Sequence, residues 1–230
     1  MKKRLLPVLL ALTLTLPLPA LAKEASTGFT DVSPEDWFAP YVAVCVEEGL
    51  LNGVGEDRFA PGQVLNSDEA LVMAARVLLK ANGEAEFPKG PDAQGFWDWA
   101  GRNAQQYSMG LSVDETQWYV DSWCWDPLVY LAQAGGPDLF PDTGITYATD
   151  RYTFFKALSF AAQGLELLVV NTVEAVPGTR DERVLDLYRA GILAGTDLYG
   201  SFDGQAPLTR AEAAAALARL ARPELRIEFT

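Results

Sequence analysis

The chain has 230 residues, of which 49% are hydrophobic, and its 31 acidic and 18 basic side chains give a formal net charge of −13. This balance excludes a nucleic-acid-binding surface, because phosphate binding needs clustered lysine and arginine. Six tryptophans and the high hydrophobic content exclude bulk disorder, and a chain of this length can bury one or two cores.

The first 22 residues have the features of an export signal. Basic residues at positions 2–4 precede an apolar run over 5–16, and the small residues Ala20 and Ala22 suit a signal peptidase. This run is shorter than the roughly 20 residues of a membrane-spanning helix. We therefore expect an exported protein with no membrane span in the mature chain. Removing 1–22 leaves 15 basic against 31 acidic residues, or a net charge of about −16.

Residues 29–79 form the first predicted helix-loop-helix repeat. Its first helix is expected over about 35–48, with Gly49 as a left-handed stop. The second is expected over 67–80. The apolar positions expected to face the core are Tyr41, Val42, Cys45 and Val46 in the first helix, and Ala70, Leu71, Ala74, Val77 and Leu78 in the second.

The two cysteines, Cys45 and Cys124, leave two alternatives open. Export permits one disulfide, but the place of Cys45 on an apolar helical stripe favours a plain buried thiol. Two separated cysteines and no histidine cannot build a metal site. We expect neither a metal nor a cofactor.

Residues 80–116 are an insertion or a decayed half repeat, and the sequence leaves both open. The stretch from Phe96 to Leu111 resembles another first helix without its partner. Tryptophans surround this segment and could fix it to the repeat that follows; they are Trp97, Trp99, Trp118 and Trp125.

Residues 117–167 are read as a second, degenerate repeat. Setting Gly135 against Gly49 places Trp123 opposite Trp37. The second helix of this repeat is expected to start near Arg151 and to run to about Leu167.

Residues 181–222 repeat the pattern of the first repeat closely. Phe59, Leu65, Ser67 and Glu69 are matched by Phe202, Leu208, Arg210 and Glu212, and the register continues to Arg76 and Arg219. Such self-similarity is typical of a modular array.

These motifs resemble the S-layer homology family. The first repeat carries Phe29-x-Asp31-Val32, Trp37 and Gly49-Leu50-Leu51-x-Gly53, and the third carries Leu208-Thr209-Arg210-Ala211-Glu212. The resemblance implies a mainly α fold of three modules around a pseudo-threefold axis. It also implies binding to a secondary cell-wall polysaccharide, often one that ends in a pyruvylated amino sugar.

The family's ligand-binding positions can be carried onto this chain one by one. The motif arginine falls on Arg210 in the third repeat and on Arg151 in the second, but on the uncharged Ser67 in the first. The opening motif of the family adds Asp31 and Trp37. Trp123 matches Trp37 in the second repeat, whereas the third has Thr179 there.

Each of these residues also has a structural interpretation. Thr209 and Glu212 have the spacing of a capping box. Arg210 would lie in the first helical turn, where the dipole disfavours a cation, so it needs either a bound anion or an acidic partner in the next repeat. In a small helical module, Trp37 and Trp123 are expected to be core residues more often than sugar platforms.

The sequence gives little support for an enzyme. Without histidine there is no Ser-His or Cys-His pair. A two-carboxylate glycosidase using Asp98, Asp114 or Glu115 remains formally open, but 31 acidic residues place such pairs together by chance. We expect a non-catalytic module that anchors to the wall of a Gram-positive type of bacterium. The alternative is a degenerate scaffold that binds a surface protein and not the wall.

Overall fold

A computed structural model describes residues 27–102, 113–135, 139–140 and 147–229, and the predicted export signal lies outside these ranges. The described parts are mainly helical, joined by long loops with isolated β-bridges. This agrees with the predicted fold class. None of the helices in these ranges is both long and apolar enough to cross a membrane.

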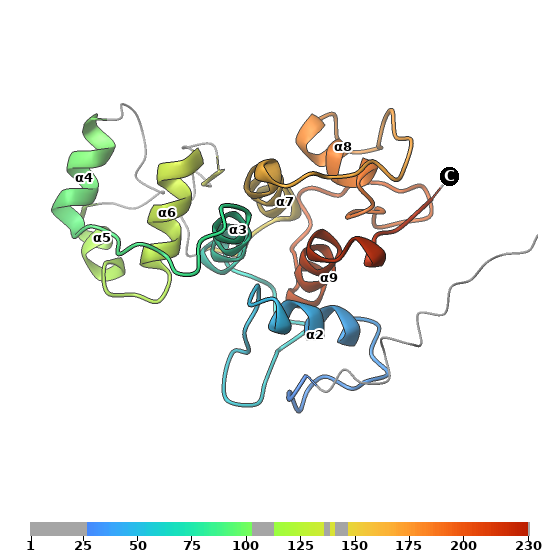
Figure 1. Cartoon of the computed structure of the whole chain (residues 1–230), viewed down its shortest axis with the longest axis horizontal. Coiled ribbons are helices and arrows are strands. Elements are labelled where there is room, and N and C mark those ends of the chain that lie inside the picture. The colour runs from blue at the N-terminus through green and yellow to red at the C-terminus, as the bar shows by residue number, and fades with distance from the viewer. Residues whose placement is uncertain (1–26, 103–112, 136–138, 141–146, 230) are drawn as a thin grey trace, which may run out of the picture.

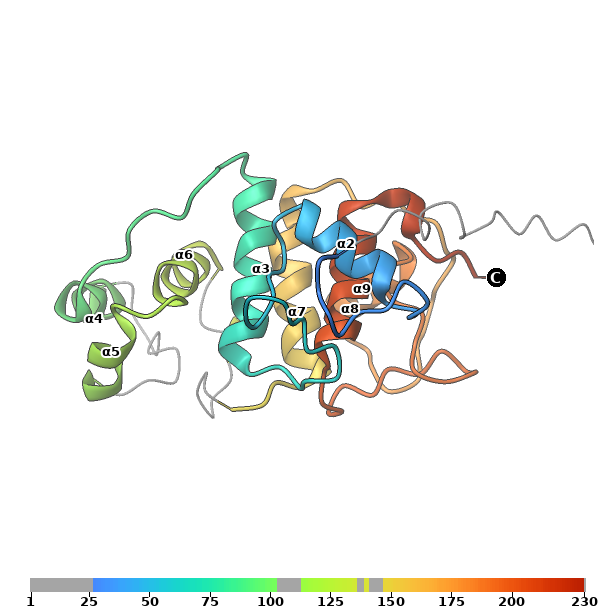
Figure 2. The ribbon, with the colours of Figure 1, turned by 90° about the horizontal axis from the view of Figure 1, so that it is seen from below.

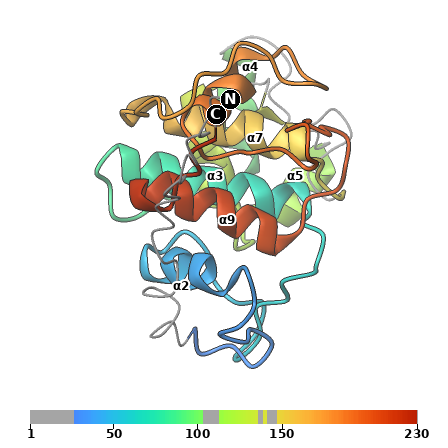
Figure 3. The ribbon, with the colours of Figure 1, turned by 90° about the vertical axis from the view of Figure 1, so that its right-hand side faces the viewer.

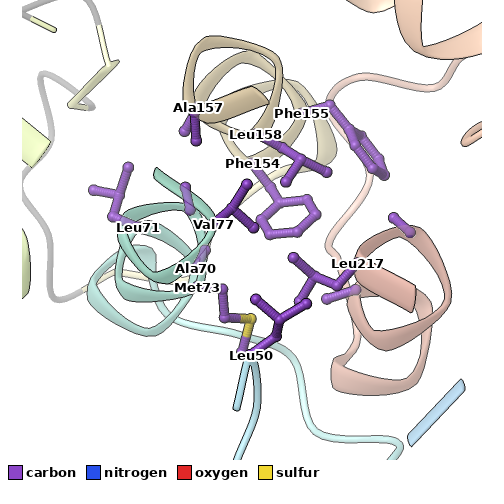
Figure 4. Close-up of a cluster of buried hydrophobic side chains, with 14 of the residues drawn as sticks. Leu50, Ala70, Leu71, Met73, Val77, Phe154, Phe155, Ala157, Leu158 and Leu217 are labelled. Atoms are coloured by element: carbon purple, nitrogen blue, oxygen red, sulfur yellow. The ribbon is translucent and has the colours of Figure 1, made fainter. Parts of the chain in front are cut away.

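Three helices of similar direction form the centre of the molecule (Figures 1 and 2). They are α3 (Ser67–Ala81), α7 (Arg151–Ala161) and α9 (Arg210–Ala221), the second helices of the three predicted repeats. Their facing sides supply the core in Figure 4, where Met73, Val77, Phe154, Leu158 and Leu217 converge. All five positions expected to be inward in α3 are buried.

A shorter helix packs on the outside of each central helix. It comes from the next repeat in cyclic order, so the first repeat follows the third. Helix α2 (Ala39–Glu47) contacts α9, α6 (Trp125–Gly135) contacts α3, and α8 (Glu182–Arg189) contacts α7. Figure 3 shows α2 lying against α9. The repeats are therefore interleaved rather than stacked as separate hairpins.

The segments that lead into the central helices are linked in a ring. The linking bridges are Val64 with Thr209, Asn66 with Ala148, and Asp150 with Pro207. The first residue of each helix donates its amide to the carbonyl four positions before the start of the next: Ser67 to Tyr147 at 2.9 Å, Arg151 to Ala206 at 3.0 Å, and Arg210 to Gln63 at 3.0 Å. This register is the same at all three junctions, whereas pseudo-threefold packing of whole repeats stays a prediction.

Glycines end two of the outer helices, as the sequence predicts. Gly49 follows α2 at φ 68° and Gly191 follows α8 at φ 70°, in the left-handed region that favours glycine. Gly135, their counterpart in the second repeat, is the last residue of α6. A Cβ there would lie 2.2 Å from the ring of Phe160, so a larger residue at this position would displace that ring.

Helix lengths differ from the predictions at two places. Helix α2 begins at Ala39 rather than near Glu35, after a series of turns that contains Asp36 and Trp37. Helix α7 ends at Ala161 rather than near Leu167, because the chain tightens into a 3₁₀ turn (Ala162–Gly164) and then becomes extended. The core prediction also fails at one position of the α2 stripe, since Val46 is 38% exposed.

The insertion forms α4 (Ala93–Arg102) and α5 (Val113–Tyr119), at the side of the molecule beyond α6 (Figure 1). Phe96 of α4 is fully buried, and its ring centroid lies 5.2 Å from that of the buried Trp125 in α6. Trp125 therefore fixes the insertion in place, as expected. Trp118 does not, because it is 78% exposed.

Both cysteines are buried free thiols, in agreement with the favoured interpretation. The Cys45 thiol lies 3.2 Å from the carbonyl oxygen of Ala214, at the contact between α2 and α9. Burial raises the pKa values of both thiols, that of Cys124 to about 11. Neither thiol is therefore ionised at neutral pH.

Candidate functional site

A groove of about 350 Å³ lies between α7 and α9, and we call it the α7–α9 groove. It begins at Arg151, crosses the loop 193–196 and one side of α9, and is bordered by Trp37 from the loop before α2. Its lining residues are Trp37, Arg151, Phe155, Leu193, Ala194, Gly195, Thr196, Glu212, Ala215, Ala216, Arg219 and Ile227.

A second groove, of about 460 Å³, lies between α9 and α3, and we call it the α9–α3 groove. Its lining residues are Leu51, Asn52, Gly53, Val54, Glu69, Val72, Met73, Arg76, Trp123 and Arg210.

The two grooves are built from corresponding positions. Arg151 corresponds to Arg210, the loop 193–196 to 51–54, and Trp37 to Trp123. On the floor, Glu212, Ala215, Ala216 and Arg219 occupy the places of Glu69, Val72, Met73 and Arg76. Each groove thus combines two arginines, one glutamate and one tryptophan, and draws them from all three predicted repeats.

Both tryptophans are exposed, which overturns the expectation that they belong to the core. Trp37 is 59% exposed and Trp123 is 61% exposed. They lie outside the core because each precedes its helix, in a loop at the edge of a groove. Exposed indole rings there can contact the apolar face of a ligand.

In the α7–α9 groove, the arginine Arg151 is buried but only partly paired. Its Nη1 donates to Oε1 of Glu212 at 2.8 Å, and 9% of its side chain is exposed. Its Nε is buried without a hydrogen-bond partner among the described residues. A buried guanidinium N–H left unpaired is costly, so an acceptor that reached this atom would be bound favourably.

Arg219 shares this property on the same groove. Its Nη1 and Nη2 lie 3.3 Å from the Ile192 carbonyl oxygen and the Tyr41 hydroxyl, while its Nε also lacks a partner in the described ranges. The guanidinium lies 4.9 Å from the Tyr41 ring centroid, and that ring packs edge-on against Trp37. The groove therefore presents two cations and one carboxylate beside an exposed indole.

In the α9–α3 groove, the corresponding arginine is occupied by the protein itself. Arg210 donates from Nε to the Phe59 carbonyl at 2.7 Å and from Nη2 to the Asn52 carbonyl at 2.6 Å. Its Nη1 lies 3.7 Å from Oε1 of Glu69. Burial lowers the pKa of Arg210, but three oxygens keep the guanidinium charge compensated. The guanidinium of Arg210 therefore has less free donor capacity than that of Arg151.

The glutamates act in capping and in pairing at once. Oε2 of Glu212 accepts the Thr209 amide at 2.9 Å, which confirms the predicted capping box, while Oε1 holds Arg151. Glu69 repeats this arrangement, because its Oε2 accepts the Asn66 amide at 3.0 Å and its Oε1 faces Arg210. The sequence left a bound anion or an acidic partner as alternatives for the motif arginine. An acidic partner is present in both grooves, and in the α7–α9 groove the Nε of Arg151 still lacks a partner among the described residues.

The third junction, from α3 to α7, lacks both members of the charge pair. Ser67 replaces the arginine, and Thr153 stands where the other helices have glutamate. The Ser67 hydroxyl instead bonds the Tyr147 carbonyl at 3.2 Å. The absence of the motif arginine from this junction is visible in the sequence, where Ser67 takes its place.

Asp31, the remaining predicted site residue, lines neither groove. Its two carboxylate oxygens accept the amides of Phe59 at 2.7 Å and Ala60 at 2.8 Å. Burial raises the pKa of Asp31, but these amides and Arg58 outweigh it and the net shift is downward. Its observed contacts close the loop of the first repeat.

Comparison with known proteins identifies the two strongest repeats. The sequence model of the S-layer homology domain family matches residues 28–70 and 173–214. These two segments of the chain match S-layer homology domains. Residues 117–167 lie outside both matched segments, so a third domain is a proposal.

A curated relative agrees with this family. The chain is 32% identical over 83 residues to a surface-layer 125 kDa protein of Lysinibacillus sphaericus. The aligned part is 35% of this chain, and it spans only 7% of the length of that relative. Together the matches support a cell-surface module of the wall-anchoring kind. S-layer homology domains are binding modules, which points away from an enzyme.

The sequence analysis did not identify Arg219 as a groove residue. It also did not predict that Trp37 shares a groove with Arg151 and Trp123 with Arg210. The repeat register had aligned Arg219 with Arg76, and that shared position was the available signal. Neighbours across repeats could not be assigned, because similarity identifies equivalent positions and not the order in which the repeats interleave.

Proposed function

We propose that this chain binds an anionic polysaccharide of the bacterial cell wall non-covalently, chiefly through the α7–α9 groove. The observation that carries the proposal is the pair of buried Nε donors on Arg151 and Arg219, both in one groove beside an exposed tryptophan. A carboxylate on a sugar would satisfy these donors. The pyranose ring would rest on Trp37.

The charge of the molecule sets limits on this function. A net charge of −13 repels an anionic polymer, so the attraction must be local to the two arginines. One glutamate compensates one arginine, which leaves a surplus positive charge in the groove. Binding should weaken with salt, although buried contacts are screened less than surface ones.

We also propose that residues 117–167 are a third, diverged S-layer homology domain. The ring of bridges and the interleaved outer helices support this, because the same register recurs at each junction. Residues 1–22 would direct export, and a Gram-positive type of wall, with its secondary polysaccharide, would be the target.

The α9–α3 groove supports a second candidate function for part of the molecule. There Arg210 is bonded to two carbonyls, so that groove fits a scaffold that holds the repeats together or binds a surface protein. The two candidates are distinguished by whether changes in the α7–α9 groove or changes in the α9–α3 groove reduce binding to a wall polymer.

Co-sedimentation with cell-wall sacculi, before and after removal of the secondary polysaccharide, tests the proposal. The informative variants are Trp37→Ala and Trp123→Ala, because both side chains are exposed and their loss spares the core. Tyr199→Ala, an exposed aromatic that lines neither groove, is the matched control. We expect pelleting with intact walls only, strongly reduced by Trp37→Ala and unchanged by the control. Absence of pelleting by the folded wild type would overturn wall binding and leave the scaffold.

A further inference from the structure

The insertion holds a cavity that neither groove includes and that lies outside both family-matched segments. It has a volume of about 690 Å³ and lies between α4 and α5. The lining residues are Ala93, Gln94, Trp97, Asp114, Gln117 and Trp118.

Two tryptophans of different exposure form its apolar part. Trp97 is held in place, because its Nε1 donates to the Thr116 hydroxyl at 3.2 Å and its ring packs edge-on against the buried Phe96. Trp118 is 78% exposed, so its ring adds little to the core. Exposed aromatic surface that borders a cavity is typical of a binding site.

The polar part consists of two amides and one carboxylate. Gln94 uses its Nε2 to bond Asp98 at 2.7 Å, which fixes the position of its side chain. Gln117 and Asp114 are exposed on α5. Amides both donate and accept, and a carboxylate accepts two hydroxyl donors, so this set matches a ligand rich in hydroxyl groups.

The charge of this region excludes the ligand class proposed for the grooves. None of the described residues that line the cavity is basic. The surrounding sequence from 81 to 126 has eight acidic residues and only Lys89 and Arg102 as basic ones. An anionic sugar would therefore be repelled here.

We propose that this cavity binds a neutral pyranose of a glycan, as a second saccharide site independent of the grooves. The apolar C–H face of the ring stacks on Trp118, with Trp97 as the fixed wall. The hydroxyl groups bond Asp114 and the two glutamines. This site shares no lining residue with either groove.

Titration of the full chain with neutral oligosaccharides tests this site, with the tryptophan indole N–H signals observed by NMR. Cellotetraose, chitotetraose and mannotetraose are the probes, each added to about 10 mM, which suffices for a Kd near 1 mM. We expect one of them to give a saturable shift of the Trp97 and Trp118 indole signals, so Trp97 still reports binding when Trp118 is replaced. That shift should survive high salt, because the ligand is uncharged, and this separates it from binding in the arginine grooves.

Variants give the result that decides the proposal. Trp118→Ala spares the core, and Asp114→Asn keeps the shape of the side chain; each should weaken binding at least tenfold. Tyr199→Ala, at an exposed aromatic outside the cavity, should leave it unchanged. Absence of a saturable shift with all three sugars, or equal binding by Trp118→Ala, overturns the proposal. Loss of wall pelleting would not affect it.

Discussion

Arg210 and Phe59 join the third predicted repeat to the first through two contacts at once. The guanidinium donates from Nε to the Phe59 carbonyl at 2.7 Å and lies 4.9 Å from the centroid of the same residue's ring. A second donor reaches the Asn52 carbonyl in the same loop. A cation in the first turn of α9, unfavourable for the helix itself, thus holds the loop between α2 and α3 of another repeat at two points.

The first prediction is that Arg210→Ala destabilises the fold. The change leaves the buried Phe59 carbonyl without its donor and removes the packing of the guanidinium on the ring. We expect the free energy of unfolding to fall by about 2–3 kcal/mol, measured by urea denaturation.

Arg151→Ala is the matched comparison at the equivalent position. It removes one ion pair with Glu212 but no carbonyl contact that the structure records for the described residues. Its effect on the unfolding free energy should be smaller, while its effect on wall binding should be larger. Equal destabilisation by the two changes would contradict the distinction between the grooves.

The second prediction concerns the junction that lacks the charge pair. Ser67→Arg alone should destabilise the protein, because Ser67 is buried and a large cation there has no acidic partner. Thr153→Glu alone should be nearly neutral, since it places an acid in the first turn of α7. The double variant should show a favourable coupling of about 1 kcal/mol in a double-mutant cycle.

Thr153→Gln is the control for this cycle, because it has the length of glutamate without its charge. If Ser67→Arg couples to glutamine as strongly as to glutamate, the restored interaction is not the ion pair. The premise that Ser67 and Thr153 replace a charge pair would then be wrong.

The fold was predictable where local chemistry decides it. The capping glutamates and the left-handed Gly49 and Gly191 follow from spacing and backbone sterics alone. The positions of Trp37 and Trp123 were not predictable, since burial depends on which repeat a loop meets. The different hydrogen-bond partners of Arg151 and Arg210 were not predictable either, because the two positions are equivalent in the repeat pattern. Arg151 pairs with Glu212, whereas Arg210 bonds the Phe59 carbonyl.

The third prediction is that neither thiol reacts until the protein unfolds. Cys45 and Cys124 are both fully buried, and burial raises the pKa of Cys124 to about 11. Because the thiolate is the reactive form, labelling with a disulfide reagent at neutral pH should be slow. Its rate should follow unfolding in urea. Rapid labelling of Cys45 in the folded chain would show that the contact between α2 and α9 opens readily.

The fourth prediction is a loss of stability in acid that depends on Asp181. This carboxylate accepts 2.6 and 2.7 Å hydrogen bonds from Arg183 Nη2 and the Tyr152 hydroxyl, and it caps α8. Arg183 is the main reason that its pKa lies far below the ordinary value, against the opposing effect of burial. The pKa of Asp31 is lowered as well. A depressed pKa in the folded state contributes stability above the unfolded value of about 3.9.

That contribution disappears as the pH falls through the folded-state pKa values, so the free energy of unfolding should decline from about pH 4 downward. Asp181→Asn removes the titrating group and should flatten this decline, while lowering stability at pH 7, where the ion pair is lost. Asp203→Asn, in an exposed loop, controls for the change in net charge. Urea denaturation at a series of pH values gives the slope for each variant. If the free energy of unfolding depends on pH in Asp181→Asn as it does in the wild type, this carboxylate does not cause the loss of stability in acid.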